Sequence, residues 1–325
     1  MPLQTRKPTG KPSWPILLLA GREKAGKTYG ALTASTSPLV NRTLYIGIGE
    51  NDPDEYATVP GVDFDIVVHD GSYEGILNAI RDAVNEPTTD HPNLIVVDSM
   101  TRLWNLIGDN MQAIANRRAK GRRTASGDYT ISADLWNVAA SQWADIMDTL
   151  RLHHGPVILT ARLDQVAVME NGAPTSQKEW KVQAHKSLVF DADAIVEMRE
   201  RGKYLLTGVK SVRLALDKPR TLPTFTVDWL WTELGLHDGV GARGHATIAV
   251  AHEGDEPAPP ARAKVNNAVK AIAGATDAAK LDEIEAYAQK LGIVGVAEVR
   301  DALAAKRAEL GKSGVDQWEA APVPE

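Results

Sequence analysis

Residues 21–28, Gly-Arg-Glu-Lys-Ala-Gly-Lys-Thr, constrain the fold of this chain more than any other segment. They match the spacing G-x-x-x-x-G-K-S/T, in which glycines allow a tight turn whose backbone N–H groups face phosphate oxygens. An apolar run, 16–20, precedes the motif, and a stretch that suits a helix, 27–33, follows it. This order predicts a phosphate-binding loop in an α/β protein. The alternative, a chance Gly-rich turn, is disfavoured by the flanking elements.

Two side chains of this loop have expected roles of their own. Lys27 is expected to contact the β- and γ-phosphates of ATP and so to take part in catalysis. Thr28 is expected to offer its hydroxyl to Mg²⁺, which needs few protein oxygens because it keeps several waters. The nucleotide-binding residues expected in this loop are Gly21, Arg22, Glu23, Lys24, Ala25, Gly26, Lys27 and Thr28.

Two carboxylates follow apolar runs and are candidates for the same site. Asp98 ends the run 93–98, where it could hold Mg²⁺ together with Thr28; the alternative is a cap for a helix starting at Met100. Glu50 follows the run 43–48, where it could orient or deprotonate the attacking water. For Glu50 the spacing leaves a solvated loop carboxylate equally open.

Apolar runs and helical stretches alternate along the first two thirds of the chain. The pattern predicts an α/β fold with a mostly parallel central sheet, its strands buried on both faces and flanked by helices. Two later runs separated by a short polar turn predict an antiparallel hairpin at its edge. The expected strands are 16–20, 43–48, 66–69, 94–98 and 156–160, the helices 27–33, 73–85 and 131–154, and the hairpin strands 194–199 and 204–209.

A Pro-rich charged stretch marks the clearest domain boundary, and a small helical domain is expected after it. The expected organisation is a flexible arm over 1–13, an α/β nucleotide-binding domain over 14–252, a linker over 253–263, a helical domain over 264–312 and a disordered tail over 313–325.

The composition excludes several classes of protein. The chain has no cysteine, so disulfides and thiolate metal sites are excluded, and its eight histidines lack the spacing of a helical zinc site. No apolar run is long enough to cross a bilayer, and no signal peptide is evident, so a soluble protein of the cytoplasm, without membrane contact, is expected. The net charge of −6 confines any nucleic-acid contact to a local basic patch.

One such patch lies at 116–124, which contains five cations and no acidic residue. A mobile DNA-binding loop is expected there, and a solvated loop or a protein-docking patch is the alternative. A second DNA-binding loop is expected over 164–191, a connection too long to be ordinary, with Trp180 as a stacking ring. The DNA-binding candidates are Arg117, Arg118, Lys120, Arg122, Arg123, Lys181 and Lys186, while Trp136, Trp143, Trp229 and Trp231 are expected in the core.

Over 14–231 the chain resembles the RecA-like P-loop ATPases, and within them the phage-encoded recombinases or single-strand annealing ATPases. The resemblance rests on the 21–28 motif, on Glu50 after its strand, and on the sequence Val-Val-Asp-Ser at 96–99. It implies a nucleotide clamped between subunits of a ring or filament, with Glu50 activating water. It also implies that Lys210 and Arg213 reach the γ-phosphate of the adjacent subunit; two exposed cations on a strand edge are the alternative. Where many relatives carry a γ-phosphate-sensing Gln, this chain has Thr160-Ala161-Arg162, and we do not expect Arg162 to substitute.

These observations predict an oligomeric, Mg²⁺-dependent ATPase stimulated by single-stranded DNA, acting in strand annealing or exchange during phage recombination in the host cytoplasm. Expected partners are single-stranded DNA, further copies of the chain and a single-strand-binding protein. Three alternatives stay open: a replicative-helicase-type motor, a nucleotide-gated loader in which binding matters more than turnover, and a P-loop kinase acting on a small molecule.

Overall fold

The computed structural model describes residues 3, 5, 7–170, 172–236, 262–290, 293–294 and 296–316. The chain divides into two compact units, 1–248 and 249–325. Of the expected segments, the end of the nucleotide-binding domain (237–252), most of the linker (253–261), the end of the tail (317–325) and residues 1, 2, 4 and 6 of the arm lie outside the described residues. Among the described residues, no helix combines the length and apolar character needed to span a bilayer.

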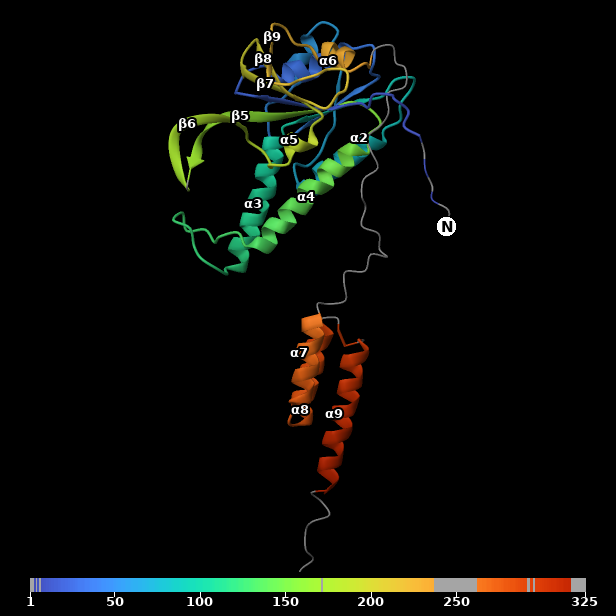
Figure 1. Ribbon diagram of the computed structural model, residues 1–325, viewed down its shortest axis with the longest axis vertical. Helices are drawn as coiled ribbons and strands as arrows, with labels where there is room; N and C mark the ends of the chain where they lie inside the picture. Colours follow the sequence, from blue (N-terminus) through green and yellow to red (C-terminus); the bar gives the residue numbers. More distant parts are fainter. Residues whose placement is uncertain are drawn as a thin grey trace, which may run out of the picture. The chain divides into compact units, whose positions relative to one another are not determined.

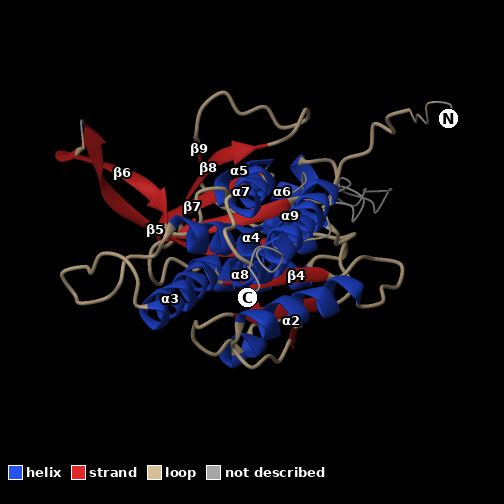
Figure 2. Ribbon diagram, turned by 90° about the horizontal axis from the view of Figure 1, so that it is seen from below, coloured by secondary structure: helices blue, strands red, loops and turns tan. Residues whose placement is uncertain are grey.

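The first unit is built on a mixed sheet flanked by helices (Figures 1 and 2). Its strands are β1 (Ile16–Gly21), β2 (Thr43–Gly47), β3 (Asp65–Ile66), β4 (Leu94–Asp98), β5 (Val157–Glu170), β6 (Ala173–Val182), β7 (Ala194–Glu200), β8 (Lys203–Val209) and β9 (Arg220–Leu222). Its helices are α1 (Lys27–Leu32), α2 (Tyr73–Asn85), α3 (Met100–Arg118), α4 (Ala133–Arg151), α5 (Leu188–Asp191) and α6 (Val227–Glu233), with 3-10 turns η1 (Thr33–Thr36) and η2 (Asp54–Thr58).

The strand order is β3-β2-β4-β5-β1-β7-β8-β9, and β6 pairs only with β5. All pairs from β3 to β7 are parallel, whereas β8 and β9 are antiparallel additions at the edge. The predicted α/β fold with an antiparallel edge hairpin is therefore confirmed. Because the central strands are parallel, the carboxyl ends of β1, β2 and β4 meet at one edge of the sheet.

Alternating residues of the central strands face two separate cores. Leu18 of β1 packs in a cluster with residues of α2, α3 and α4, among them Ile80 and Ile107. Its neighbours Leu17 and Leu19 pack in the other cluster, with residues of α1 and α6. Figure 1 shows the same layers, with α2, α3 and α4 on one side of the sheet and α6 on the other. A strand buried on both faces is apolar at every position, which is why these strands were visible in the sequence.

The segment expected as a long loop over 164–191 is instead mostly a β-hairpin, so this prediction was wrong. Strand β5 continues past the parallel sheet, and β6 returns antiparallel to it from a turn in which Gly172 has φ 82°. Both ribbon views show the hairpin projecting from the core (Figures 1 and 2). The dipeptide Asn171-Gly172 between two strand-like runs is the signal that could have identified it.

Two expectations about burial were also wrong. Trp136, expected in the core, is 44% exposed near the start of α4, where its ring centroid lies 6.2 Å from that of Trp104 on α3. Strand β3, expected to be buried on both faces, is a two-residue edge strand in which Ile66 is 43% exposed. Trp143 and Trp231 are fully buried, and Trp229 is partly buried.

The second unit contains the helices α7 (Arg262–Ala273), α8 (Ala278–Lys290) and α9 (Ala297–Asp316). They bury a core of their own, which includes Ile272, Leu281, Val299 and Leu303. The helices extend beyond the expected limits of the helical domain: α7 begins inside the expected linker, and α9 continues into the expected tail. Helical periodicity in a short Ala-rich segment does not mark where a helix ends.

Candidate active site at the carboxyl edge of the sheet

The loop over 21–28 joins β1 to α1, and its glycines satisfy two different steric demands. At Gly21 a Cβ atom would lie 2.9 Å from the carbonyl oxygen of Met198, because β7 runs directly beside β1 there. At Gly26 the backbone has φ 99°, a conformation that side chains rarely adopt, and this residue is the N-cap of α1. The turn thereby directs the first N–H groups of α1 out of the helix end.

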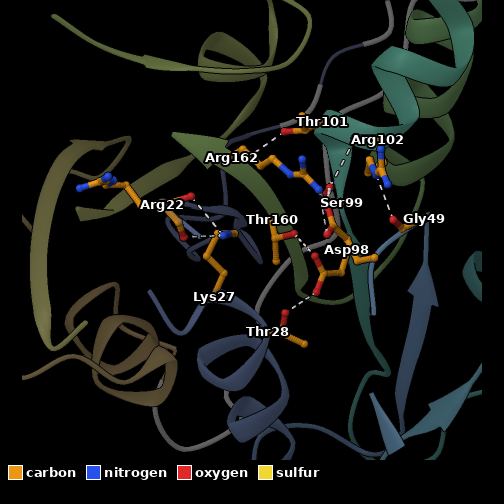
Figure 3. A network of polar contacts seen from close by, with 12 residues as sticks. Arg22, Lys27, Thr28, Gly49, Asp98, Ser99, Thr101, Arg102, Thr160 and Arg162 are labelled. Atoms are coloured by element: carbon orange, nitrogen blue, oxygen red, sulfur yellow. Dashed lines mark hydrogen bonds and ion pairs between the residues drawn. The ribbon is translucent and has the colours of Figure 1, made fainter. Parts of the chain in front are cut away.

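The Lys27 side chain curls over this loop (Figure 3). Its ammonium donates to the carbonyl of Gly21 at 3.1 Å and to that of Arg22 at 2.9 Å. Burial lowers the pKa of Lys27 below its usual value, and the negative charges of Asp98 and Glu50 partly oppose that shift. A cation is thus held at the mouth of the loop, where a phosphate would need one.

Asp98, at the end of β4, gathers hydroxyl donors from three other elements. Thr28 of α1 donates to its Oδ2 at 2.6 Å, Tyr45 of β2 donates to Oδ2 at 3.3 Å, and Thr160 of β5 donates to Oδ1. Period-two alternation places Asp98 and Thr160 on the α1 side of the sheet, and Asp98 is only 2% exposed. Burial raises the pKa of the Tyr45 hydroxyl, as does the neighbouring carboxylate, so this group remains a donor.

The structure separates the two interpretations that the sequence allowed for Asp98 and Ser99. Ser99 is the N-cap of α3, and its hydroxyl accepts from the backbone N–H of Arg102 at 3.4 Å. Asp98 belongs to the strand and faces Thr28 instead. Sequence reasoning missed Tyr45 and Thr160, because no local pattern marks a hydroxyl that meets a carboxylate from another strand.

The donor set around Asp98 fits Mg²⁺. This hard cation prefers oxygen ligands, keeps several waters, and commonly takes only one or two carboxylates from a protein. Thr28 and Asp98 supply a hydroxyl and a carboxylate 2.6 Å apart. Within the described part of the chain, no group of three or more His, Cys, Asp or Glu side chains is placed to hold a metal ion by itself.

Glu50 lies beside Asp98 rather than in open solvent, with its side chain 26% exposed. It follows Gly49, which has φ 60° and whose carbonyl accepts from the Arg102 side chain at 2.9 Å. The Glu50 carboxylate accepts from the Ser99 hydroxyl at 2.7 Å and from Arg162 Nη2 at 3.0 and 3.1 Å to its two oxygens. Sequence reasoning discounted Arg162, which the structure places in this site.

Lys210 and Arg213 lie near the amino ends of the parallel strands, whereas residues 21–28 lie at their carboxyl ends. Strand β8 runs antiparallel to β7, so its end, at Val209, pairs with Ala194 at the beginning of β7. Lys210 lies there, with its ammonium 3.7 Å from the Asp193 carboxylate. The structure therefore does not bring this pair to the phosphate-binding loop of its own chain; only a second copy could place them near a nucleotide.

The basic segment is only partly the loop that was expected. Arg117 and Arg118 belong to the last turn of α3, and Arg118 forms an ion pair with Asp134 of α4 at 2.5 Å. The remaining three cations, Lys120, Arg122 and Arg123, lie in the α3–α4 connection and are exposed. This connection folds on itself, since Arg123 stacks over the Tyr129 ring at 4.8 Å.

The α3–α4 connection and the β5–β6 hairpin project from the same side of the first unit in both ribbon views (Figures 1 and 2). Lys181 lies on β6, opposite Asp164 of β5, and Lys186 follows the hairpin. Trp180, the expected stacking ring, is partly buried and lies 5.3 Å from the Arg199 guanidinium. The two segments singled out for DNA therefore project on the same side of the first unit, although Trp180 already has a stacking partner.

A family model described as an AAA domain matches residues 15–223. No curated protein matches the sequence. Among solved structures, the chain is similar to the crystal structure of the RadB recombinase, with 16% identity, coverage of 60% of this chain and 81% of that chain, and a TM-score of 0.34. A score this low supports no argument about function.

Proposed function

The chain belongs to the AAA domain family over residues 15–223, and from this membership we propose that it is a Mg²⁺-dependent ATPase whose turnover is coupled to single-stranded DNA in recombination. The observation that carries the proposal is the meeting of Thr28, Lys27 and Asp98 at the carboxyl edge of the sheet. Open α/β sheets bind their ligands at this edge. The phage setting rests only on the resemblance of the motifs.

The residues of the loop would act on the nucleotide phosphates in complementary ways. The N–H groups at the start of α1 would donate to phosphate oxygens, and Lys27 would exchange its carbonyl partners for the β- and γ-phosphates. Thr28 and Asp98 would hold Mg²⁺, which when bound neutralises part of the phosphate charge. Tyr45 and Thr160 keep the Asp98 carboxylate in place by donating to it.

Glu50 is the residue we assign to the attacking water. Its carboxylate lies at the same edge as Asp98, and the Ser99 hydroxyl fixes one of its oxygens. A carboxylate in this position can accept a hydrogen bond from water and take its proton as the bond to phosphorus forms. Glu50→Gln should therefore bind ATP but turn it over slowly, whereas Lys27→Ala should weaken binding itself.

We propose self-association because the resemblance to RecA-like ATPases assigns Lys210 and Arg213 to the nucleotide of an adjacent subunit. Because they lie at the edge opposite the phosphate-binding loop, they would meet a nucleotide only in a head-to-tail assembly of identical chains. There they would stabilise charge that develops on the transferred phosphoryl group. A monomer should accordingly show little turnover, and activity should rise more steeply than protein concentration.

The cations of the α3–α4 connection and of the β5–β6 hairpin are the proposed contact with single-stranded DNA. Backbone phosphates attract such cations without regard to sequence, so we propose binding with little base preference and strong salt dependence. Lys120 and Arg122 are exposed and would turn toward a strand, whereas Arg123 would first have to leave the Tyr129 ring. Arg118 is less available because it is bound to Asp134.

Steady-state ATP hydrolysis with and without single-stranded DNA tests the proposal. The variants are Lys27→Ala and a chain in which Arg117, Arg118, Lys120, Arg122 and Arg123 are changed to Gln. A matched control neutralises five exposed cations of the second unit, Lys270, Lys280, Lys290, Arg300 and Arg307. We expect DNA to raise wild-type and control turnover, and the five-cation variant to lose only this stimulation. Wild-type turnover that ignores DNA would favour a small-molecule kinase or a protein-activated switch.

A further inference from the structure

The backbone of Arg162 connects the phosphate-binding loop with the projecting β5–β6 hairpin, because it contacts three other segments. Its backbone pairs with Gly21 in the parallel register of β1 and β5, directly beside the start of the phosphate-binding loop. Its N–H donates to the Thr101 hydroxyl at 2.8 Å, and its carbonyl accepts from Gln183 N–H at 2.8 Å, at the base of the hairpin. Arg162 is therefore the point where the core strand becomes the hairpin strand.

The side chain of this residue reaches Glu50. Nη2 of Arg162 lies 3.0 Å from one carboxylate oxygen of Glu50 and 3.1 Å from the other. The first of these oxygens also accepts from the Ser99 hydroxyl at 2.7 Å. A carboxylate that takes a proton from water must direct an oxygen lone pair toward that water, and here both oxygens are directed toward a guanidinium.

Strand β5 also contacts Asp98, the other carboxylate of the site, through Thr160, two residues before Arg162. Thr160 donates to Asp98, and Arg162 holds Glu50, so β5 contacts both acidic groups on its way to the hairpin. Figure 3 shows Thr160 and Arg162, which are separated by one residue on this strand, beside Asp98 and Ser99. A shift or twist of the hairpin base would thus act on Glu50 through a single rigid strand.

We infer that Arg162 is a positioning residue that latches Glu50 in a low-turnover orientation, and that a ligand bound along the β5–β6 hairpin releases the latch. The inference deepens the proposed function and rests on it, because Glu50 is taken as the water-activating group and single-stranded DNA as the ligand of the hairpin. The latch does not hold the fold together: the Arg162 side chain is 47% exposed, and exposed ion pairs contribute little to stability.

The test is the ATPase rate of Arg162→Gln in the full chain, with and without single-stranded DNA. We expect the DNA-free rate to rise about tenfold, part of the roughly hundredfold or more that a positioned base contributes. Added DNA should then raise the rate little further. A matched control is Arg42→Gln. Arg42, just before β2, is also an ion-paired arginine; its side chain is 46% exposed and is bound to Asp65 and Glu86. This control should keep the wild-type rates.

An unchanged or lower DNA-free rate in Arg162→Gln would overturn the latch, because a merely structural or directly assisting arginine gives that result. Thermal unfolding and ATP binding of the variant confirm that it is folded; should it unfold, Arg162→Met, which keeps the apolar stem, replaces it. The two ideas can fail separately. Wild-type turnover that ignores DNA counts against the proposed function, whereas the DNA-free rate of the variant decides the latch.

Discussion

Thr28 and Asp98, separated by 70 positions in the chain, meet at 2.6 Å across the carboxyl edge of the sheet, where the Thr28 hydroxyl donates to the Asp98 carboxylate. Thr28 lies in the first turn of α1, directly after β1, and Asp98 ends β4, which is two places from β1 in the strand order. Their meeting converts a loop motif and an isolated strand-end carboxylate into one site for nucleotide and metal.

Asp98→Asn should abolish Mg²⁺-dependent hydrolysis and also destabilise the first unit. The carboxylate accepts from Thr28, Tyr45 and Thr160, and an amide cannot accept all three, so at least one buried hydroxyl loses its partner. A buried unsatisfied donor costs about 1–3 kcal/mol of unfolding free energy. Urea unfolding and ATPase assays check this, with Asp90→Asn, an exposed carboxylate, as the control. Wild-type stability in Asp98→Asn would contradict the network.

Gly21→Ala should be destabilising although alanine is the smallest possible addition. Its Cβ would lie 2.9 Å from both the Cβ and the carbonyl oxygen of Met198, and the strand backbone cannot easily move. Overpacking of this kind costs about 1–3 kcal/mol. The control is Gly108→Ala in α3, where no atom lies within 4 Å of the added Cβ and helix propensity predicts a gain of about 0.5–1 kcal/mol. Opposite signs in denaturant unfolding are the expected result.

Lys27 should make stability depend on alkaline pH in a defined direction. Its pKa in the folded chain is below the ordinary value of 10.5 because burial disfavours the charged form. Between the folded pKa and 10.5 the unfolded chain binds more protons, so rising pH favours the folded state over that window. The free energy of unfolding of the wild type minus that of Lys27→Met should therefore increase as the pH rises toward 10.5. A difference between the two that is constant across the window would show that burial does not disfavour the ammonium.

Asp134→Asn should strengthen binding to single-stranded DNA. Hydrogen bonds from Ser132 and Arg118 lower the pKa of Asp134 to about 2. The Asp134 side chain is therefore charged at neutral pH and forms an ion pair with Arg118. Without the Asp134 charge, Arg118 can contact DNA, and a negative group that repels the DNA phosphates is gone. We expect the affinity for single-stranded DNA to rise about threefold to tenfold. Fluorescence anisotropy at two salt concentrations measures this. Asp109→Asn, an exposed carboxylate on α3, is the control, and equal effects of the two variants would argue against a specific role for Arg118.

The sequence by itself determined the class of the fold and the phosphate-binding loop, because both are local. A strand buried on two faces is apolar along its length, and residues 21–28 carry the required glycines, lysine and threonine next to that strand. Asp98 and Glu50 could be placed at one edge because the ends of parallel strands meet there. No partner across the sheet was needed for any of these inferences.

Only the tertiary structure decided the rest, because it depends on register and strand order between distant segments. The contact of Arg162 with Glu50 exists because β5 continues past Thr160, a length that the hydrophobic pattern of 156–160 did not reveal. Lys210 and Arg213 fall at the far edge because β8 reverses direction beside β7. Trp136, near the start of α4, lies against Trp104 of α3 and stays 44% exposed. Each of these outcomes follows from which elements become neighbours, and local residue patterns leave that choice open.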